Sequence, residues 1–231
     1  MTAATIKAAD GGSFSAYLAL PEGGSGPGMI VIQEIFGVNK VMRDICDDYA
    51  ARGYVAICPD LFWRIEPGID ITDQSEEEWK KAFELFQAFD VDKGVEDLKA
   101  TLAFLRDYDG CSGKIGAVGY CLGGKLAYLL AARSDVDASV GYYGVGIEDM
   151  LGEAKQISAP LMLHIAEEDQ FVPKDAQQQV HAALDRHENV TLHDYPDQDH
   201  AFARQGGDHF DAASADAANR RSAEFFQTNL G

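Results

Sequence analysis

Runs of apolar residues alternate with amphipathic stretches along most of this chain. Residues 30–32 are a continuous β-branched run. A second apolar run begins at residue 54, in the segment 54–62, and is stopped by Pro59. Both runs are typical of strands buried on two faces. Residues 39–52, which lie between them, predict a helix. After residue 114 the alternation becomes regular. We predict strands at 115–118, 138–142, 161–165 and 190–195, and helices at 123–132, 175–187 and 214–228.

Strands that alternate with helices indicate a mostly parallel central sheet with helices on both faces, which is the α/β class. The first twenty residues add two short strands around a Gly-Gly turn. Ser75 with Glu78 three residues later is a capping box that begins another helix, followed by one at 91–106. The chain has no internal repeat, low-complexity tract or linker, so we expect a single domain over residues 1–231.

Composition narrows the class of function. Of the 231 residues 46% are hydrophobic and 25% charged, which is typical of a soluble globular protein, and the formal net charge is −19. This charge argues against nucleic acid and anionic membranes as partners. No basic N-terminal stretch precedes an apolar run, and no apolar run reaches the length of a membrane span. We therefore expect a cytoplasmic protein that acts on a small molecule. Its acidic surface favours a monomer.

One of the four cysteines stands out by its position. No pair of cysteines has the spacing of a zinc or thioredoxin-type site, and Cys46, Cys58 and Cys111 are interpreted as small buried hydrophobes. Cys121 instead lies at the centre of Gly-x-Cys-x-Gly, where a predicted strand turns sharply into a predicted helix. Active sites of open α/β sheets lie at such strand ends, and this pattern is a nucleophile elbow with sulfur in place of oxygen.

The elbow predicts both a nucleophile and its oxyanion hole. The amides and dipole of a helix N-terminus favour a thiolate, and the amide of Leu122 is the expected first oxyanion donor. The second donor is expected from the early loop "QEIFGVN", where we select the amide of Ile35. The structural alternative is a buried cysteine in a tight turn, so the assignment depends on finding an acid and a base downstream.

The acid and the base are expected in that chain order after the nucleophile. The strand at 161–165 ends in "AEEDQFVP", from which we select Asp169, because Glu167 and Glu168 are as readily solvated turn residues. Of six histidines, His200 follows the last strand and precedes the last helix, the place where the general base belongs. Cys121, Asp169 and His200 are therefore the predicted triad.

The segments "QEIFGVN", "GYCLGG", "GYYGVG", "D-x-F-V-P" and "HAFAR" together resemble the dienelactone hydrolase family of α/β-hydrolases over nearly the whole chain. The resemblance implies hydrolysis of 4-carboxymethylenebut-2-en-4-olide to maleylacetate through a cysteine thioester, in the breakdown of chlorinated or hydroxylated aromatics. It implies no metal and no organic cofactor. It also implies that Glu34 lies by the thiol as a proton switch; the alternative is an acid that caps a loop.

The resemblance implies arginines that hold the substrate carboxylate, and here the sequence departs from the family pattern. Arg204 fits one such role, and Phe36 and Tyr142 of the shared motifs are expected to contact substrate. A second arginine is expected near 75–85, yet none lies between positions 64 and 106, and Trp79 and Phe83 occupy the comparable places. Those two aromatic residues are either core or part of an apolar substrate pocket.

Two alternatives therefore stay open beside a dienelactone hydrolase. One keeps the triad and assigns a different lactone, ester or thioester, which the missing arginine allows. The other is a redox-responsive thiol protein on a hydrolase-like scaffold, although an acid and a histidine in triad order are not needed for that role.

Overall fold

The computed structural model describes residues 2–231, which form two compact units, one ending at Ala117 and the other running from Val118 to Gly231. Strand β5, Cys111–Tyr120, begins in the first unit and ends in the second. The single domain expected over residues 1–231 stays a prediction.

The first unit is built on strands in the order β1-β2-β4-β3-β5. Their bounds are β1 Thr2–Lys7, β2 Ser13–Ala19, β3 Gly26–Ile32 and β4 Val55–Pro59. β1 with β2 and β2 with β4 are antiparallel, whereas β3 and β4 are parallel. Residues 29–32 and 55–58 are fully buried, as their unbroken apolar runs predict.

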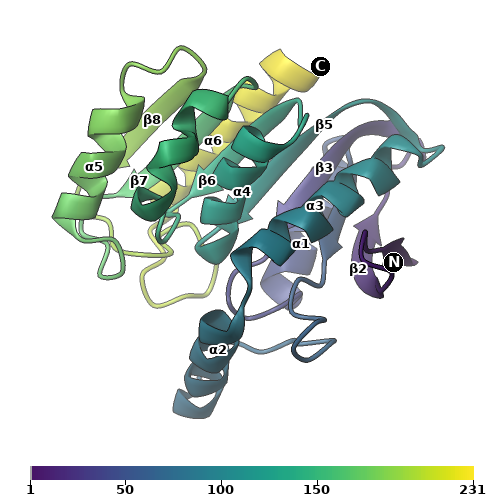
Figure 1. The fold of residues 1–231 in the computed structure, drawn as a ribbon, viewed down its shortest axis with the longest axis horizontal. Helices are drawn as coiled ribbons and strands as arrows, with labels where there is room; N and C mark the ends of the chain where they lie inside the picture. Colours follow the sequence, from purple (N-terminus) through teal and green to yellow (C-terminus); the bar gives the residue numbers. More distant parts are fainter. Residues whose placement is uncertain (1) are drawn as a thin grey trace. The chain divides into compact units, whose positions relative to one another are not determined.

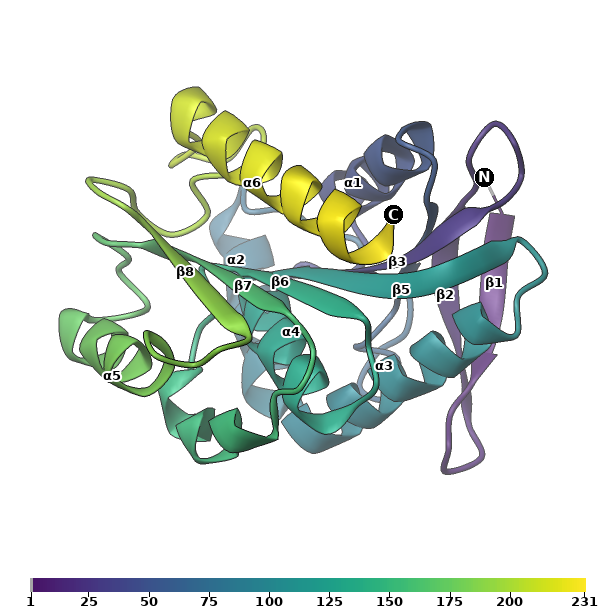
Figure 2. The same cartoon turned by 90° about the horizontal axis from the view of Figure 1, so that it is seen from above.

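The helices of the first unit begin at capping residues that are visible in the sequence. They are α1 Lys40–Ala51, α2 Glu76–Ala88 and α3 Val91–Arg106, preceded by Asn39, Ser75 and Asp90. Each capping side chain accepts a backbone hydrogen bond from the first turn; the Glu78 amide donates to Ser75 Oγ at 3.2 Å. Figure 2 shows α1 on one side of the strands of this unit and α3 on the other.

The second unit carries the end of β5 and then β6, β7 and β8 in that order. Its elements are β6 Ala138–Tyr142, β7 Leu161–Ala166, β8 Val190–Tyr195, α4 Leu122–Arg133, the 3₁₀ helix η1 Glu148–Gln156, α5 Lys174–Leu184 and α6 Ala212–Leu230. β6, β7 and β8 are parallel. In Figure 1 and Figure 2, α4 and α5 lie on one face of these strands and α6 on the other.

The structure confirms the α/β class and a mostly parallel arrangement of strands covered by helices. The predicted bounds of β6, β8 and α3 are reproduced to the residue. The sequence interpretation missed η1, and it was wrong to continue the α5 helix to His187, because a turn closed by the bond from the His187 amide to the Leu184 carbonyl follows the helix. No helix within residues 2–231 is long and apolar enough to cross a lipid bilayer.

Candidate active site

Cys121 lies at the sharp turn between β5 and α4 that the Gly-x-Cys-x-Gly pattern predicts. Its backbone has φ 55° and ψ −115°, a conformation that residues with a side chain rarely adopt. The turn demands glycine nearby: a Cβ atom added to Gly119 would lie 1.9 Å from the carbonyl oxygen of Gly123. Cys121 is therefore held in a strained backbone conformation, and 8% of the residue's surface is exposed.

The same turn presents the first backbone amides of α4. The Cys121 carbonyl accepts hydrogen bonds from the amides of Gly124 (2.9 Å) and Lys125 (3.3 Å), which closes the first turn around the residue. Leu122 is the first residue of the helix, where amides have no partner within the helix itself. This placement is compatible with the expected oxyanion role of Leu122, which stays a prediction.

The structure brings the three predicted triad residues together in the second unit. His200 Nδ1 lies 2.8 Å from Asp169 Oδ2, and the His200 ring is also hydrogen bonded to Cys121. Asp169 follows β7, and its other oxygen accepts the amide of Phe171 at 2.8 Å, so both carboxylate oxygens are engaged. The imidazole therefore joins a buried carboxylate on one side to a cysteine at a helix start on the other.

Charge around His200 favours its protonated form. Burial lowers its pKa, but the charge of Cys121 and the hydrogen bonds that the ring makes to Asp169 and Cys121 outweigh this and raise the pKa to about 10. A histidine with that pKa is an imidazolium near pH 7, and it lies here between the carboxylate of Asp169 and the side chain of Cys121.

Two aromatic rings flank His200, and the sequence interpretation identified neither of them. The ring of Tyr143 lies edge-on at 5.1 Å between centroids, and the ring of Phe171 at 4.9 Å. Tyr143 belongs to the segment "GYYGVG" and Phe171 to "D-x-F-V-P". The sequence signal that could have identified them is their position next to residues already assigned to the site. With the imidazole between two rings, His200 has little freedom to rotate out of the line from Asp169 to Cys121.

Tyr142, which the sequence interpretation selected for substrate contact, has its side chain directed toward α6. Its hydroxyl lies 3.0 Å from Asn219 Oδ1 and 2.7 Å from Ser222 Oγ, and the residue is 1% exposed. Its backbone carbonyl accepts the amide of Cys121 at 3.1 Å, so the residue supports the elbow through its main chain. A role for Tyr142 in substrate binding stays a prediction.

Backbone strain gathers around this site. Four residues other than glycine have a positive φ within residues 2–231: Cys121 (55°), Tyr143 (37°), Asp197 (61°) and Ala201 (64°). Cys121 is the predicted nucleophile, Tyr143 contacts His200, and Ala201 directly follows His200. Strained backbone that the surrounding structure maintains is a common property of functional sites.

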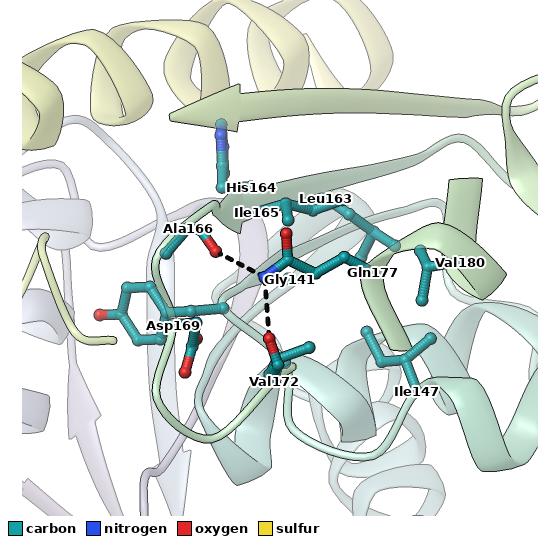
Figure 3. Close-up of a pocket in the computed structure, with 12 residues that line it drawn as sticks. Gly141, Ile147, Leu163, His164, Ile165, Ala166, Asp169, Val172, Gln177 and Val180 are labelled. Atoms are coloured by element: carbon teal, nitrogen blue, oxygen red, sulfur yellow. Dashed lines mark hydrogen bonds between the residues drawn. The ribbon is translucent and has the colours of Figure 1, made fainter. Parts of the chain in front are cut away.

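A small cavity of about 20 Å³ lies beside Asp169, between β6, β7 and α5 (Figure 3). It has room for roughly one water molecule, which is too little for a lactone, and neither Cys121 nor His200 lines it. Gln177 of α5 reaches past the cavity and donates to the carbonyls of Ala166 (3.3 Å) and Val172 (2.8 Å), which flank the loop that carries Asp169. Gln177 thereby holds this loop against α5.

Arg204 lies in the turn that follows His200. Its amide donates to the Ala201 carbonyl at 2.9 Å, and its carbonyl accepts the amide of Gly207 at 3.1 Å. The residue is half-buried. Its expected contact with a substrate carboxylate stays a prediction.

The other predicted site residues lie in the first unit. Glu34 (2% exposed), Ile35 and Phe36 are buried in the loop after β3. The ring of Phe36 contacts Trp79 edge-on at 5.1 Å, and Trp79 stacks on Phe83 at 5.5 Å. Phe83 is 39% exposed, so this aromatic cluster runs from the buried loop to the surface of α2. The roles expected for these five residues stay predictions.

No group of three or more histidine, cysteine, aspartate or glutamate side chains within residues 2–231 is arranged to hold a metal ion.

Comparison with known proteins gives consistent results. The model of the dienelactone hydrolase family matches residues 14–230. A protein of Azospirillum brasilense with the provisional name carboxymethylenebutenolidase is 51% identical over 239 residues, covering 100% of both chains. The carboxymethylenebutenolidase of Pseudomonas putida is 38% identical over 221 residues, covering 96% of this chain and 94% of the relative.

Among solved structures, a Klebsiella pneumoniae protein provisionally named dienelactone hydrolase superposes with a TM-score of 0.83. It is 27% identical and covers 98% of each chain.

Proposed function

The chain belongs to the dienelactone hydrolase family, and on that premise we propose that it hydrolyses dienelactone to maleylacetate through a thioester on Cys121. Membership makes the protein an enzyme that hydrolyses carboxylic esters or lactones. The observation that supports the cysteine mechanism is His200, which is hydrogen bonded to Asp169 at 2.8 Å and also to Cys121.

The acylation step follows from the position of Cys121. Its sulfur, as the thiolate, attacks the lactone carbonyl, and the tetrahedral oxyanion accepts hydrogen bonds from the amides of Leu122 and Ile35. The intermediate collapses with cleavage of the ring C–O bond. The ring oxygen takes the electron pair of that bond and leaves as an enolate, which needs little help from an acid, and the acyl group remains on the sulfur as a thioester.

The deacylation step follows from the charges around His200. Formation of the thioester removes the anionic sulfur, which is the main factor that raises the pKa of His200, while burial continues to lower it. The imidazolium then gives its proton to the enolate, and the neutral ring, oriented by Asp169, takes a proton from water as the water attacks the thioester and the sulfur leaves as a thiolate. Acylation itself thus prepares the base for the next step.

Glu34 is proposed as a proton switch for the alternative resting state, in which the sulfur of Cys121 is a thiol and not a thiolate. Either it holds the Cys121 thiol protonated between turnovers, or it takes the thiol proton when substrate binds, which would limit oxidation of the sulfur. Its 2% exposure is compatible with a carboxylate that is kept from bulk water.

The carboxylate of dienelactone requires a positive group, and Arg204 is the proposed one. A guanidinium suits this task because it can bind a carboxylate through two hydrogen bonds. The corresponding metabolic role is the breakdown of aromatic or chloroaromatic compounds, for which the named activity of the Pseudomonas putida relative is the support.

The first experiment compares kcat/KM for dienelactone with kcat/KM for a neutral aryl ester of similar size. We expect a strong preference for dienelactone, and we expect Cys121→Ala to retain less than about a hundredth of wild-type activity on both substrates. In His200→Asn we expect a thioester that mass spectrometry detects as a mass increase on Cys121. If Cys121→Ala keeps its activity, and if His200→Asn neither slows nor accumulates a thioester, the mechanism is contradicted.

A second candidate function is hydrolysis of a different, less anionic lactone, ester or thioester. It is favoured by the absence of arginine between positions 64 and 106 and by the cluster of Phe36, Trp79 and Phe83. Arg204→Ala discriminates between the two candidates. If dienelactone is the substrate, this change raises KM for dienelactone far more than KM for the neutral ester, whereas an equal effect on both favours the second candidate.

A redox-responsive thiol protein is the remaining alternative from another class. Hydrolysis of a chromogenic ester by the wild-type protein that disappears in Cys121→Ala would exclude it. The contacts between His200 and Asp169 weigh against it, because a sensor thiol has no need of an oriented base.

A further inference from the structure

A row of hydrogen bonds joins the loop that carries Asp169 to the loop that carries His200. β7 and β8 are parallel and pair up to Ala166 and Tyr195, so the two loops leave the same edge of the strands side by side. The amide of Glu167 donates to the Tyr195 carbonyl at 3.1 Å, and the amide of Glu168 donates to the Gln198 carbonyl at 2.8 Å. These two bonds are between backbone atoms.

The next bond in the row uses a side chain. Asp199 Oδ1 accepts the amide of Gln170 at 3.0 Å and the amide of His200 at 2.6 Å. Its other oxygen lies 3.4 Å from the side-chain amide of Gln170. The Asp199 carboxylate therefore holds both Gln170, which directly follows Asp169, and His200.

His209 extends the same arrangement from the following loop. Its Nδ1 lies 3.1 Å from the His200 carbonyl and 3.6 Å from Asp199 Oδ2. The backbone of His200 is thus held at its amide by Asp199 and at its carbonyl by His209. This backbone carries strain, since Ala201 next to it has φ 64°, and strained backbone persists only where its surroundings fix it.

We propose that Asp199 is a positioning residue, which sets the distance between the imidazole of His200 and the carboxylate of Asp169 by accepting hydrogen bonds from both loops. It touches neither the substrate nor the reacting atoms. The proposal rests on the proposed function in one respect only, that His200 is the base of the reaction.

The geometry of the acceptor, and not the negative charge, is what this role requires. Asparagine keeps an oxygen at the Oδ1 position, so Asp199→Asn should preserve the two amide bonds without the charge. Glutamate keeps the charge but moves the carboxylate by one methylene group, so Asp199→Glu should lose the bonds. Asp199→Ala loses both the acceptor and the charge.

The experiment measures kcat and KM of these three variants on the best substrate found for the wild-type enzyme. We expect Asp199→Ala and Asp199→Glu to lower kcat about tenfold, with KM within about twofold of wild type, and Asp199→Asn to stay within about threefold of wild-type kcat. Asp208→Ala, which removes the same charge from the loop of His209, is the matched control and should leave both constants unchanged. Unfolding curves for all variants separate lost activity from lost structure.

A spectroscopic readout makes the test independent of turnover. The proton between His200 Nδ1 and Asp169 should give a downfield NMR signal in the wild-type protein and in Asp199→Asn. The signal should broaden or move upfield in Asp199→Ala and Asp199→Glu. If Asp199→Glu retains kcat and Asp199→Asn loses it, or if Asp199→Ala leaves both kcat and this signal unchanged, the proposal is overturned. Cys121→Ala, measured in parallel, shows separately whether the proposed function fails.

Discussion

Removal of the Cys121 sulfur should change the protonation of His200. The pKa of His200 is about 10 against an ordinary 6.5, and this difference corresponds to on the order of 5 kcal/mol in favour of the imidazolium. Burial works against that preference, and the charge of Cys121 is the first factor in its favour, followed by Asp169. In Cys121→Ala the raising effect of the sulfur is gone, and Asp169 remains to counteract the lowering of the pKa by burial. We therefore expect the pKa of His200 to fall well below 10.

The assay is a pH titration followed by the NMR signals of carbon-13-labelled histidine side chains. The chain has six histidines, and the His200 signal is identified by its disappearance in His200→Asn. His181 serves as an internal reference. Burial lowers the pKa of this histidine, but its hydrogen bonds to Asp185 and Asp194 raise the pKa overall, and neither partner is changed by the substitution. The titration of His181 should therefore be identical in wild type and variant.

The titration of His200 should differ between the wild-type protein and Cys121→Ala. In the wild-type protein, His200 should remain protonated from pH 6 to above pH 9, while in Cys121→Ala it should lose its proton within that range. If His200 titrates at the same pH in both proteins, the sulfur is not the anionic partner that keeps the imidazole protonated. That result would refute the charge-based account of deacylation and would favour the proposal that Glu34 keeps the thiol protonated.

Three further substitutions test the packing that supports the fold and the site. Gly119→Ala places a Cβ atom 1.9 Å from the Gly123 carbonyl oxygen and should destabilise the protein by about 3 kcal/mol or more in urea unfolding; near-wild-type stability would show that the elbow is looser than described. Gln177→Leu removes the donor to the carbonyls of Ala166, Glu167 and Val172 and should lower the free energy of unfolding by about 1–3 kcal/mol, with kcat falling as the loop that carries Asp169 loosens. Unchanged unfolding and unchanged kcat would contradict this. Arg64→Met deprives the buried carboxylate of Asp97 of two hydrogen bonds and should destabilise by about 3 kcal/mol, an effect that Asp97→Asn in the same chain should partly reverse.

The elements that the sequence predicted well are those whose signals are local. A capping residue and a helical period of apolar residues define α2 from Ser75 onward, and an unbroken apolar run at residues 30–32 defines the end of β3. The turn at Cys121 is of the same kind, because glycines at fixed offsets have one physical reason, the close approach of strand and helix. Such signals need no knowledge of distant residues.

Side-chain direction was less accessible to the sequence. Tyr142 and Tyr143 are neighbours in one motif, and the interpretation selected Tyr142 for the site. Tyr142 is the last residue of β6 and points to α6, whereas Tyr143 has left the strand with a φ of 37° and packs on His200. Consecutive side chains on a strand point to opposite faces, so the two neighbouring tyrosines have different surroundings, while a substrate contact for Tyr142 stays a prediction.

The loop "PDQDH" shows where prediction from one sequence ends. The pairing of Ala166 with Tyr195 follows from strand ends that the sequence located to within a residue, so the meeting of the Asp169 and His200 loops was predictable. Which acid of the loop would bridge them was not, because Asp197 and Asp199 are chemically identical and two residues apart. Asp197 adopts φ 61°, a conformation that aspartate tolerates better than most residues, and the turn it makes places Asp199 against the other loop. The choice between two identical side chains was made by the backbone conformation of one of them, and that conformation depends on contacts the sequence does not display.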